Sequence, residues 1–393
     1  MKTFYRVIDV FKNIYGRPAM LFYKICHYLP LNKRMILFES EPDLCDNSWA
    51  LYQHIKKNHL GYKFVWVVSN TDKFKKNEDG ETKFVTRFGK GMHLKALYYY
   101  ATAKYSFWTH WTLHHYIPRK GQTVINLWHG IPIKATKVKN HEYYNWLIST
   151  EQNTNHLFSK YLGCDMSKIL PLGYPRNDLL LHNIGVGTDN PYCKIKGIKK
   201  VIIWMPTFRQ SINKRLSENL CDTATGLPLL DSETELRHLD DYLSIKDVII
   251  IIKIHHLQAE KVLFKKSFKN IIILTDEILA KDNIQLYQIV GKTDALITDF
   301  SSIMFDYMLT DKPIGFILDD IDKYNKSCGF LIDDPRSLMK GEHVYDISQL
   351  YNFIDDIIND KDKYRAERNN LRKKIHIADN TSACENIVNY FNI

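Results

Sequence analysis

Residues 124–130 read Val-Ile-Asn-Leu-Trp-His-Gly and run directly into Ile-Pro-Ile-Lys at 131–134. A short apolar run that stops in a turn is typical of a strand buried in a parallel sheet. Gly130 has no Cβ atom, so backbone or a ligand can approach it closely, while Pro132 stiffens the exit from the turn. Ligands bind beyond the carboxyl ends of parallel strands. The segment therefore predicts an α/β fold and places His129 where a general base would act.

Similar apolar runs recur on both sides of this segment. In the first half, strands are predicted at 35–40, 62–70, 105–109, 124–128 and 146–150, with a helix at 47–57. In the second half, strands are predicted at 201–205, 248–254, 271–274, 295–298 and 314–318, with a helix at 303–309. Such alternation predicts parallel sheets covered by helices.

The length of 393 residues is too great for one compact core and suits two domains. We predict Rossmann-like domains at 31–185 and 198–346, joined by a stretch that contains Gly, Pro and Asn. A charged, helix-rich tail is predicted at 347–393. If the two domains face each other, the cleft between them is the expected ligand site.

Residues 1–30 form a basic amphipathic segment. One apolar stripe at helical spacing comprises Phe4, Val7, Ile8, Phe11, Ile14 and Tyr15, and a second comprises Leu21, Phe22, Ile25 and Leu29. A basic, aromatic-rich amphipathic helix is typical of an element that lies on a membrane surface. The alternative is a helix that packs on the domain core, and spacing alone does not separate the two.

The composition narrows the class of protein. The formal net charge of +10 favours anionic partners, but the basic residues are dispersed, which argues against a nucleic-acid-binding protein. No apolar run reaches the ~18 residues of a membrane-spanning helix, and no signal peptide is visible. The seven cysteines form no CxxC pair, which favours a reducing, cytoplasmic compartment. We expect no metal and no cofactor.

Side chains able to bind an anion follow other predicted strands. Lys253 and His255 lie two apart at a strand end and share one face. Ser301 and Ser302 start a helix on which Asp306 is one turn from Ser302, an arrangement that suits a phosphate or a ribose hydroxyl. The alternatives are a solvated strand end and a serine cap that needs no ligand. Other candidates at such positions are Thr207, Arg209 and Arg176.

Five of these segments, in this order, resemble the CDP-glycerol glycerophosphotransferase family, whose members prime or polymerise teichoic acids and related capsule polymers. The segments are LWHGIPIK (127–134), LGYPRND (172–178), MPTFR (205–209), KIH (253–255) and TDFSSIMFDYMLTDKPIGF (298–316). Each segment is short, but five in the right order are specific.

The resemblance implies a fold similar to GT-B glycosyltransferases, with an acceptor domain and a donor domain facing across a cleft. It implies that His129 deprotonates the acceptor and that His255 stabilises charge on the departing CMP. The substrate contacts it implies are Gly130, Ile131, Pro132, Ile133, Arg176, Thr207, Phe208, Arg209, Lys253, Ser301, Ser302 and Asp306.

The expected function is transfer of glycerol phosphate, or a related polyol phosphate, from a CDP-polyol to a hydroxyl of a lipid-linked acceptor. The expected location is the cytoplasmic face of the cell membrane, on an anionic surface, with no nucleic acid partner. The alternative is a GT-B glycosyltransferase that uses a nucleotide-sugar, since the segments at 205–209 and 298–302 suit either donor.

Overall fold

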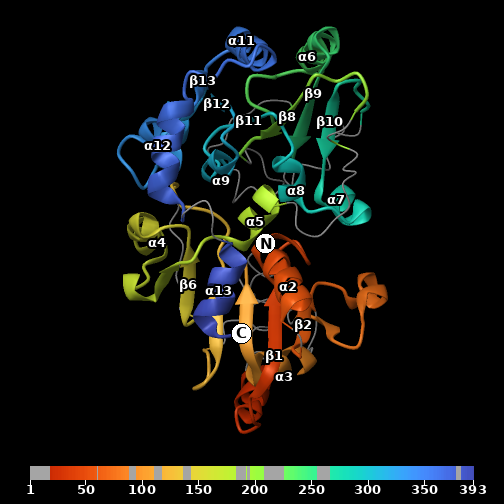
Figure 1. Cartoon of the computed structure of the whole chain (residues 1–393), viewed down its shortest axis with the longest axis vertical. Coiled ribbons are helices and arrows are strands. Elements are labelled where there is room, and N and C mark those ends of the chain that lie inside the picture. The colour runs from red at the N-terminus through yellow and green to blue at the C-terminus, as the bar shows by residue number, and fades with distance from the viewer. Residues whose placement is uncertain are drawn as a thin grey trace, which may run out of the picture.

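The structure is a computed structural model that describes part of the chain in detail. The described residues are 18–59, 61–87, 94–109, 117–135, 143–182, 192, 195–207, 225–254, 266–377 and 382–393. The first expected apolar stripe, at residues 4–15, lies outside them. Figure 1 shows two α/β lobes stacked along the long axis of the molecule.

The first lobe is a seven-stranded parallel sheet with the order β3-β2-β1-β4-β5-β6-β7. Its strands are β1 (Asn32–Glu39), β2 (Lys63–Val68), β3 (Thr82–Thr86), β4 (Ala103–Trp108), β5 (Thr123–Asn126), β6 (Trp146–Ser149) and β7 (Ile169–Pro171). Its helices are α2 (Asp46–Asn58), α3 (Leu94–Thr102), α4 (Asn155–Leu162) and α5 (Pro175–His182).

The second lobe is a six-stranded parallel sheet with the order β10-β9-β8-β11-β12-β13. Its strands are β8 (Lys200–Met205), β9 (Val248–Lys253), β10 (Ile271–Leu274), β11 (Ala295–Thr298), β12 (Ile314–Ile317) and β13 (Glu342–Val344). The helices that follow β8 are α6 (Glu233–Lys246), α7 (Asp276–Asp282), α8 (Leu286–Val290), α9 (Ile303–Tyr307), α10 (Ile321–Ser327), α11 (Ile347–Ile358), α12 (Arg365–Ile375) and α13 (Ala383–Phe391).

In each sheet the chain begins at a central strand, builds to one edge, and then returns to build the other. The order of strands therefore reverses between β1 and β4 in the first sheet and between β8 and β11 in the second. Such a reversal is where doubly wound sheets bind ligands. The expectation of two Rossmann-like sheets is confirmed, and β5, β8 and β11 all end near these reversal points.

Each strand predicted from the sequence is present within a few residues of its predicted bounds. Three further strands, β3, β7 and β13, were not predicted, and all three lie at sheet edges. An edge strand pairs on one side only, so it can be short and need not be a continuous apolar run. The helix predicted at 303–309 is α9 followed by a 3₁₀ turn at Met308–Thr310.

The C-terminal helices connect the two lobes. The helix α11 buries Leu350, Phe353, Ile354 and Ile357 on the second sheet. After α12 the chain returns to the first lobe, where α13 packs on α2 and α5. The carboxylate of Asp178 in α5 accepts hydrogen bonds from the Ser382 hydroxyl at 2.7 Å and from the Cys384 amide at 2.9 Å. Figure 1 shows the blue C-terminal helix beside α2.

The N-terminal helix, seen from residue 18 to 26, packs on the first lobe through a face other than its apolar stripe. Ala19, Tyr23 and Cys26 are its buried residues, while Leu21 is 61% exposed and Ile25 is 55% exposed. Of the two alternatives left open by the sequence, packing of this stripe on the domain core is therefore not seen for Leu21 and Ile25. Small Ala19 and Cys26 allow close approach to the lobe, and Tyr23 reaches the Ile117 carbonyl at 3.1 Å. Among the described residues, no helix has the length and apolar character needed to cross a bilayer.

Candidate active site

The turn that carries His129 leaves the carboxyl end of β5 and has an unusual backbone. Trp128 has a φ of +55° and Gly130 a φ of +138°. Residues with a side chain rarely adopt the first conformation, and the second is essentially restricted to glycine. His129 lies between them, half-buried, with its ring stacked on Trp128 at a centroid distance of 4.4 Å. The neighbouring backbone therefore dictates the direction of this side chain.

The imidazole of His129 is oriented by a backbone carbonyl. Its Nδ1 lies 3.3 Å from the carbonyl oxygen of Thr109, at the end of β4. A hydrogen bond of this kind places the proton on Nδ1 and the basic lone pair on Nε2. Thr109 is itself fixed, because its hydroxyl contacts the Ser48 hydroxyl at 2.6 Å and accepts a hydrogen bond from the Ser48 amide. This arrangement is suited to a general base.

Gly130 brings the His129 turn into contact with the second lobe. A Cβ atom added to Gly130 would lie 2.8 Å from Cβ of Ser302 and closer still to its hydroxyl oxygen. The hydroxyl of Ser302 makes no capping hydrogen bond to α9. The serine therefore lies against the His129 turn and does not cap α9 through its side chain.

Two side chains hold the carbonyl groups of the turn. Asn47, at the start of α2, donates from its amide to the Trp128 carbonyl at 2.7 Å. Arg176, at the start of α5, donates from Nη2 to the His129 carbonyl at 3.0 Å. The two residues are also linked to each other, since the Arg176 amide donates to Oδ1 of Asn47 at 3.0 Å. Sequence analysis predicted a helix beginning at Asn47 but assigned this residue no role.

Arg176 and Asp306, both predicted as substrate contacts, are paired with each other. Nη2 of Arg176 lies 2.5 Å from Oδ2 of Asp306, and both side chains are almost completely buried. Nη1 of Arg176 contacts the carboxylate of Asp46 at 3.1 Å. Burial alone would lower the pKa of Arg176, but the carboxylates of Asp306 and Asp46 outweigh it and raise that pKa well above its ordinary value.

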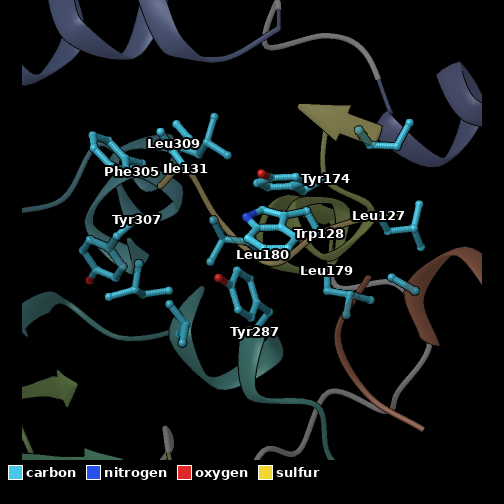
Figure 2. Close-up of a cluster of buried hydrophobic side chains, with 14 of the residues drawn as sticks. Leu127, Trp128, Ile131, Tyr174, Leu179, Leu180, Tyr287, Phe305, Tyr307 and Leu309 are labelled. Carbon is cyan, nitrogen blue, oxygen red and sulfur yellow. The ribbon is translucent and has the colours of Figure 1, made fainter. Parts of the chain in front are cut away.

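A tyrosine completes the environment of Asp306. The Tyr287 hydroxyl, from α8, donates to Oδ2 of Asp306 at 2.6 Å. Burial raises the pKa of Tyr287 well above its ordinary value, and the Asp306 carboxylate adds to this effect, so the phenol remains a donor. The Arg176 guanidinium lies over the Tyr287 ring at 4.6 Å. Figure 2 shows Tyr174, Trp128, Leu180 and Tyr287 as one buried cluster shared by the two lobes.

The ends of the second-lobe strands hold a second polar group. The amide of Thr207 donates to both carboxylate oxygens of Asp299 at 2.9 Å, and its hydroxyl donates to Oδ1 at 2.5 Å. Lys134 reaches across from the first lobe, with Nζ 3.4 Å from the Thr207 hydroxyl. Thr207 follows β8 and Asp299 follows β11, so this group marks the reversal point of the second sheet.

Backbone hydrogen bonds join the lobes on one side of this group. The Leu331 amide donates to the Ile133 carbonyl at 2.8 Å, and the Ala135 amide donates to the Gly329 carbonyl at 3.0 Å. Lys160 adds a side-chain bond to the Leu331 carbonyl at 2.6 Å. The segment after His129 is thus paired with the second lobe.

The predicted site residues fall into four groups. One group lies together around the turn and comprises His129, Gly130, Arg176, Ser302 and Asp306. Ser301 precedes Ser302 in the chain, and Thr207 contacts Lys134, which follows the turn. Ile131, Pro132 and Ile133 are buried, and the two isoleucines belong to the core. Lys253 is paired with Asp276 at 2.9 Å and is nine-tenths buried. His255, Phe208 and Arg209 lie outside the described residues.

This arrangement can place a base against a bound hydroxyl in one lobe and present hydroxyl groups to an anion in the other. Those are the requirements of group transfer between two substrates held in a cleft. Among the residues that the structure describes, no group of His, Cys, Asp and Glu could hold a metal ion.

Comparison with known protein families gives one match that covers most of the chain. The sequence model of a family described as CDP-Glycerol:Poly(glycerophosphate) glycerophosphotransferase matches residues 21–392.

Individual relatives agree with this match. The chain is 29% identical over 324 residues to the teichoic acid poly(glycerol phosphate) polymerase of Staphylococcus epidermidis, an alignment that covers 75% of this chain and 41% of that protein. It is 26% identical over 363 residues to the teichoic acid poly(glycerol phosphate) polymerase of Bacillus spizizenii, with 84% of this chain and 85% of that protein covered. The chain thus spans less than half of the first relative and most of the second.

A solved structure has the same fold. The wall teichoic acid polymerase TagF superposes with a TM-score of 0.71 at 22% sequence identity, over 100% of this chain and 97% of that chain. The GT-B-like architecture expected from the sequence is confirmed.

Proposed function

Because this chain belongs to the CDP-glycerol:poly(glycerophosphate) glycerophosphotransferase family, we propose that it transfers a polyol phosphate from a CDP-polyol to an acceptor hydroxyl. The donor is CDP-glycerol or a related CDP-polyol, the acceptor is lipid-linked, and the product enters a teichoic acid or capsule-type polymer. Relatives that carry the names of glycerol phosphate and ribitol phosphate enzymes support a CDP-polyol donor for this chain.

The observation that carries the proposal is the position of His129. Nε2 of this residue is the basic nitrogen of a half-buried imidazole, in a turn that contacts the second lobe at Ser302. In the proposed reaction His129 takes the proton from the acceptor hydroxyl, whose oxygen attacks the β-phosphorus of the CDP-polyol. The new P–O bond forms as the bond to CMP breaks, and CMP leaves with the bonding electron pair. Positioning and electrostatic stabilisation supply most of the acceleration in phosphoryl transfer.

The second lobe supplies the donor site in this proposal. Ser301 and Ser302 contact the phosphates, and Thr207 lies at the reversal point where a nucleotide would bind. Lys253, Phe208, Arg209 and the role of His255 on the departing CMP stay predictions that rest on the family resemblance. The lack of a side chain at Gly130 lets Ser302 approach the turn, while Ile131, Pro132 and Ile133 act through the packing of the turn.

The test is CMP release by purified protein from CDP-glycerol, CDP-ribitol and UDP-sugars, with a lipid-linked acceptor and mass spectrometry of the product. A positioned base contributes ~10²–10⁴-fold, so His129→Ala should lower turnover by at least about 100-fold with the fold intact. His343→Ala is the matched control, because His343 is also half-buried but lies on the edge strand β13. Near-wild-type turnover by His129→Ala would reject the assignment, and release of UDP instead of CMP would favour the glycosyltransferase alternative.

The exposed apolar face of the N-terminal helix supports a location at the inner face of the membrane. Met20, Leu21 and Ile25 of the helix are exposed, as are Tyr28 and Leu29 just after its end. A helix that buries one face on the protein and leaves large apolar side chains on the other is suited to an interfacial position. The net charge of +10 would add attraction to anionic lipid. A lipid-linked acceptor would then meet the enzyme at that surface.

Flotation with vesicles containing anionic lipid tests this location. Replacing both Leu21 and Ile25 by Asp should reduce the bound fraction severalfold, because a charge at each position opposes insertion. Ile245→Asp is the control, since Ile245 is 78% exposed on α6 of the second lobe. Equal flotation of all three proteins would reject the apolar face as the docking surface without bearing on the transferase reaction.

A further inference from the structure

Arg176 and Asp306 are the most deeply buried ion pair that joins the two lobes in the described part of the chain. Arg176 belongs to α5 and Asp306 to α9, and their side chains are 5% and 1% exposed. Their contact at 2.5 Å lies beside the His129 turn, because Nη2 of Arg176 also donates to the His129 carbonyl at 3.0 Å. One guanidinium nitrogen therefore connects a carboxylate of the second lobe to the backbone of the proposed base.

Both oxygens of Asp306 are occupied by protein donors. Oδ2 accepts from Arg176 and from the Tyr287 hydroxyl, and Oδ1 accepts from the Asn177 amide at 3.3 Å. A direct contact from Asp306 to a nucleotide would require these bonds to break inside a dry environment. Removing a partner from a buried charge is strongly unfavourable. The carboxylate is arranged to hold protein groups.

Both terminal nitrogens of Arg176 are likewise occupied by protein groups, while its buried Nε has no hydrogen-bond partner among the described residues. Nη1 contacts both carboxylate oxygens of Asp46, at 3.1 and 3.2 Å, while the Arg176 backbone amide donates to Asn47. Asn47 holds the carbonyl of Trp128, and Arg176 holds the next carbonyl, that of His129. Two successive carbonyls of the turn are thereby fixed from outside it. A planar guanidinium with several donors in fixed directions is suited to this task, and a lysine is not.

The turn requires such support. Positive φ angles at Trp128 and Gly130 flank His129, and such conformations persist only where the surroundings enforce them. On the side of the turn that faces the second lobe, Asp306 holds Arg176 and Ser302 packs against Gly130. Ser302 directly precedes the first turn of α9, and Asp306 lies within that helix.

We propose that Asp306 and Arg176 are a positioning pair that sets the orientation of His129 when the lobes are together, and that neither touches the substrate. The sequence favoured them as substrate contacts, and the geometry reassigns them. The proposal rests on the proposed function in one respect, the role of His129 as base. If the pair acts in this way, the position of the base His129 in the first lobe depends on Asp306 of the second lobe.

The test separates positioning from binding by comparing turnover with donor affinity. Asp306→Asn is nearly isosteric, Arg176→Gln shortens the side chain, and each removes the charge of one partner. A misplacement of a reacting group by about 1 Å can cost about 100-fold in rate, so kcat should fall by about that factor. The KM for CDP-glycerol and the Kd for CMP, measured by calorimetry, should change by less than about threefold, because uniform substrate binding is untouched.

Arg368→Gln is the matched control. Arg368 is 1% exposed and paired with Asp362, but both residues belong to the C-terminal segment and neither contacts the His129 turn. It should lose thermal stability to a comparable extent while its kcat stays within about threefold of wild type. A loss of kcat in Arg368→Gln as large as in Arg176→Gln would show that general destabilisation explains the effect.

Hydrogen–deuterium exchange of the peptide covering residues 124–135 gives a readout independent of activity. Exchange should be faster in Arg176→Gln and Asp306→Asn than in wild type and in Arg368→Gln, because the guanidinium that holds the His129 carbonyl is removed in the first variant and loses its partner in the second. Unchanged exchange, or a rise of tenfold or more in the Kd for CMP with kcat retained, would overturn the proposal. Failure of wild-type protein to release CMP from any CDP-polyol would instead reject the proposed function, and the exchange result would still decide the positioning role.

Discussion

Gly130→Ala tests the contact between the His129 turn and the second lobe with a single added methyl group. Two features of the structure oppose this methyl group. The backbone at Gly130 has a φ of +138°, and the new Cβ would lie 2.8 Å from Cβ of Ser302, with the serine hydroxyl closer still. The first cost belongs to the backbone of one lobe, whereas the second exists only if Ser302 of the other lobe is in place.

Each of the two costs has a typical magnitude. A non-glycine residue in such a conformation costs about 1–3 kcal/mol. Forcing an extra methyl group into a packed contact costs typically another ~1–3 kcal/mol. Gly130→Ala should therefore destabilise the protein by about 2–6 kcal/mol. For domains of this size each kcal/mol lowers the Tm by roughly 2–4 °C, so a decrease of at least about 4 °C is expected.

A double-mutant cycle isolates the part that crosses the lobes. Ser302→Gly removes the atoms that the new methyl group would meet, so Gly130→Ala should cost only the backbone share of about 1–3 kcal/mol in that background. Calorimetric Tm values of wild type, both single variants and the double variant provide the comparison. An unchanged Tm in Gly130→Ala would refute the backbone argument, and equal costs in the two backgrounds would refute the contact with Ser302.

Three further outcomes are expected. Asn47→Ala leaves the Trp128 carbonyl buried without its donor, which should cost about 1–3 kcal/mol and lower turnover; urea unfolding and CMP release check it, and full turnover would contradict it. Asp178→Ala removes the acceptor of the first amides of α13, so exchange of residues 383–391 should accelerate while that of α11 does not; unchanged exchange would show that α13 is held by packing alone. Burial raises the pKa of Asp79, but the Lys56 ammonium and the amides of Glu81 and Thr82 outweigh it and lower that pKa to about 2. Because the pKa of Asp79 is lower in the folded than in the unfolded protein, its ionised carboxylate stabilises the fold at pH values above its unfolded pKa, and this stabilisation is lost as the pH falls towards 2. The Tm difference between wild type and Asp79→Asn, which is small at this partly exposed pair, should therefore shrink from pH 6 to pH 3. A Tm difference that stays constant with pH would contradict this direction.

Most of the strands could be predicted in outline because the central strands are apolar on both faces. Residues 201–204 and 248–252 carry continuous branched and aromatic side chains, and all of them are buried in the structure. The edge strands β3 and β13 lack this signal. In β3, Lys83 alternates with Phe84, and β13 contains only Glu342, His343 and Val344, so neither stands out from a loop in sequence.

Individual residues of the candidate site could be singled out from the sequence, but the contacts between them could not. His129, Arg176 and Asp306 each stood out through a local segment. The ion pair between Arg176 and Asp306 joins positions 130 residues apart, and no periodicity links them. Asn47 had no distinguishing local pattern, because its function depends on carbonyl groups that lie 81 residues later in the chain.

The return of α13 to the first lobe has a consequence for how this protein is made. Asp178 bonds to Ser382 across 204 residues of sequence. A ribosome must therefore deliver the whole second lobe before the first can bury α2 and α5 beneath their last helix. During synthesis the apolar surface of α2 and α5 stays uncovered in the first lobe until α13 has been made. All strands of the second lobe are synthesised before α13. The lobe that is synthesised first is thus the one that is completed last. The nascent chain should therefore depend on chaperones most while the second lobe is being made.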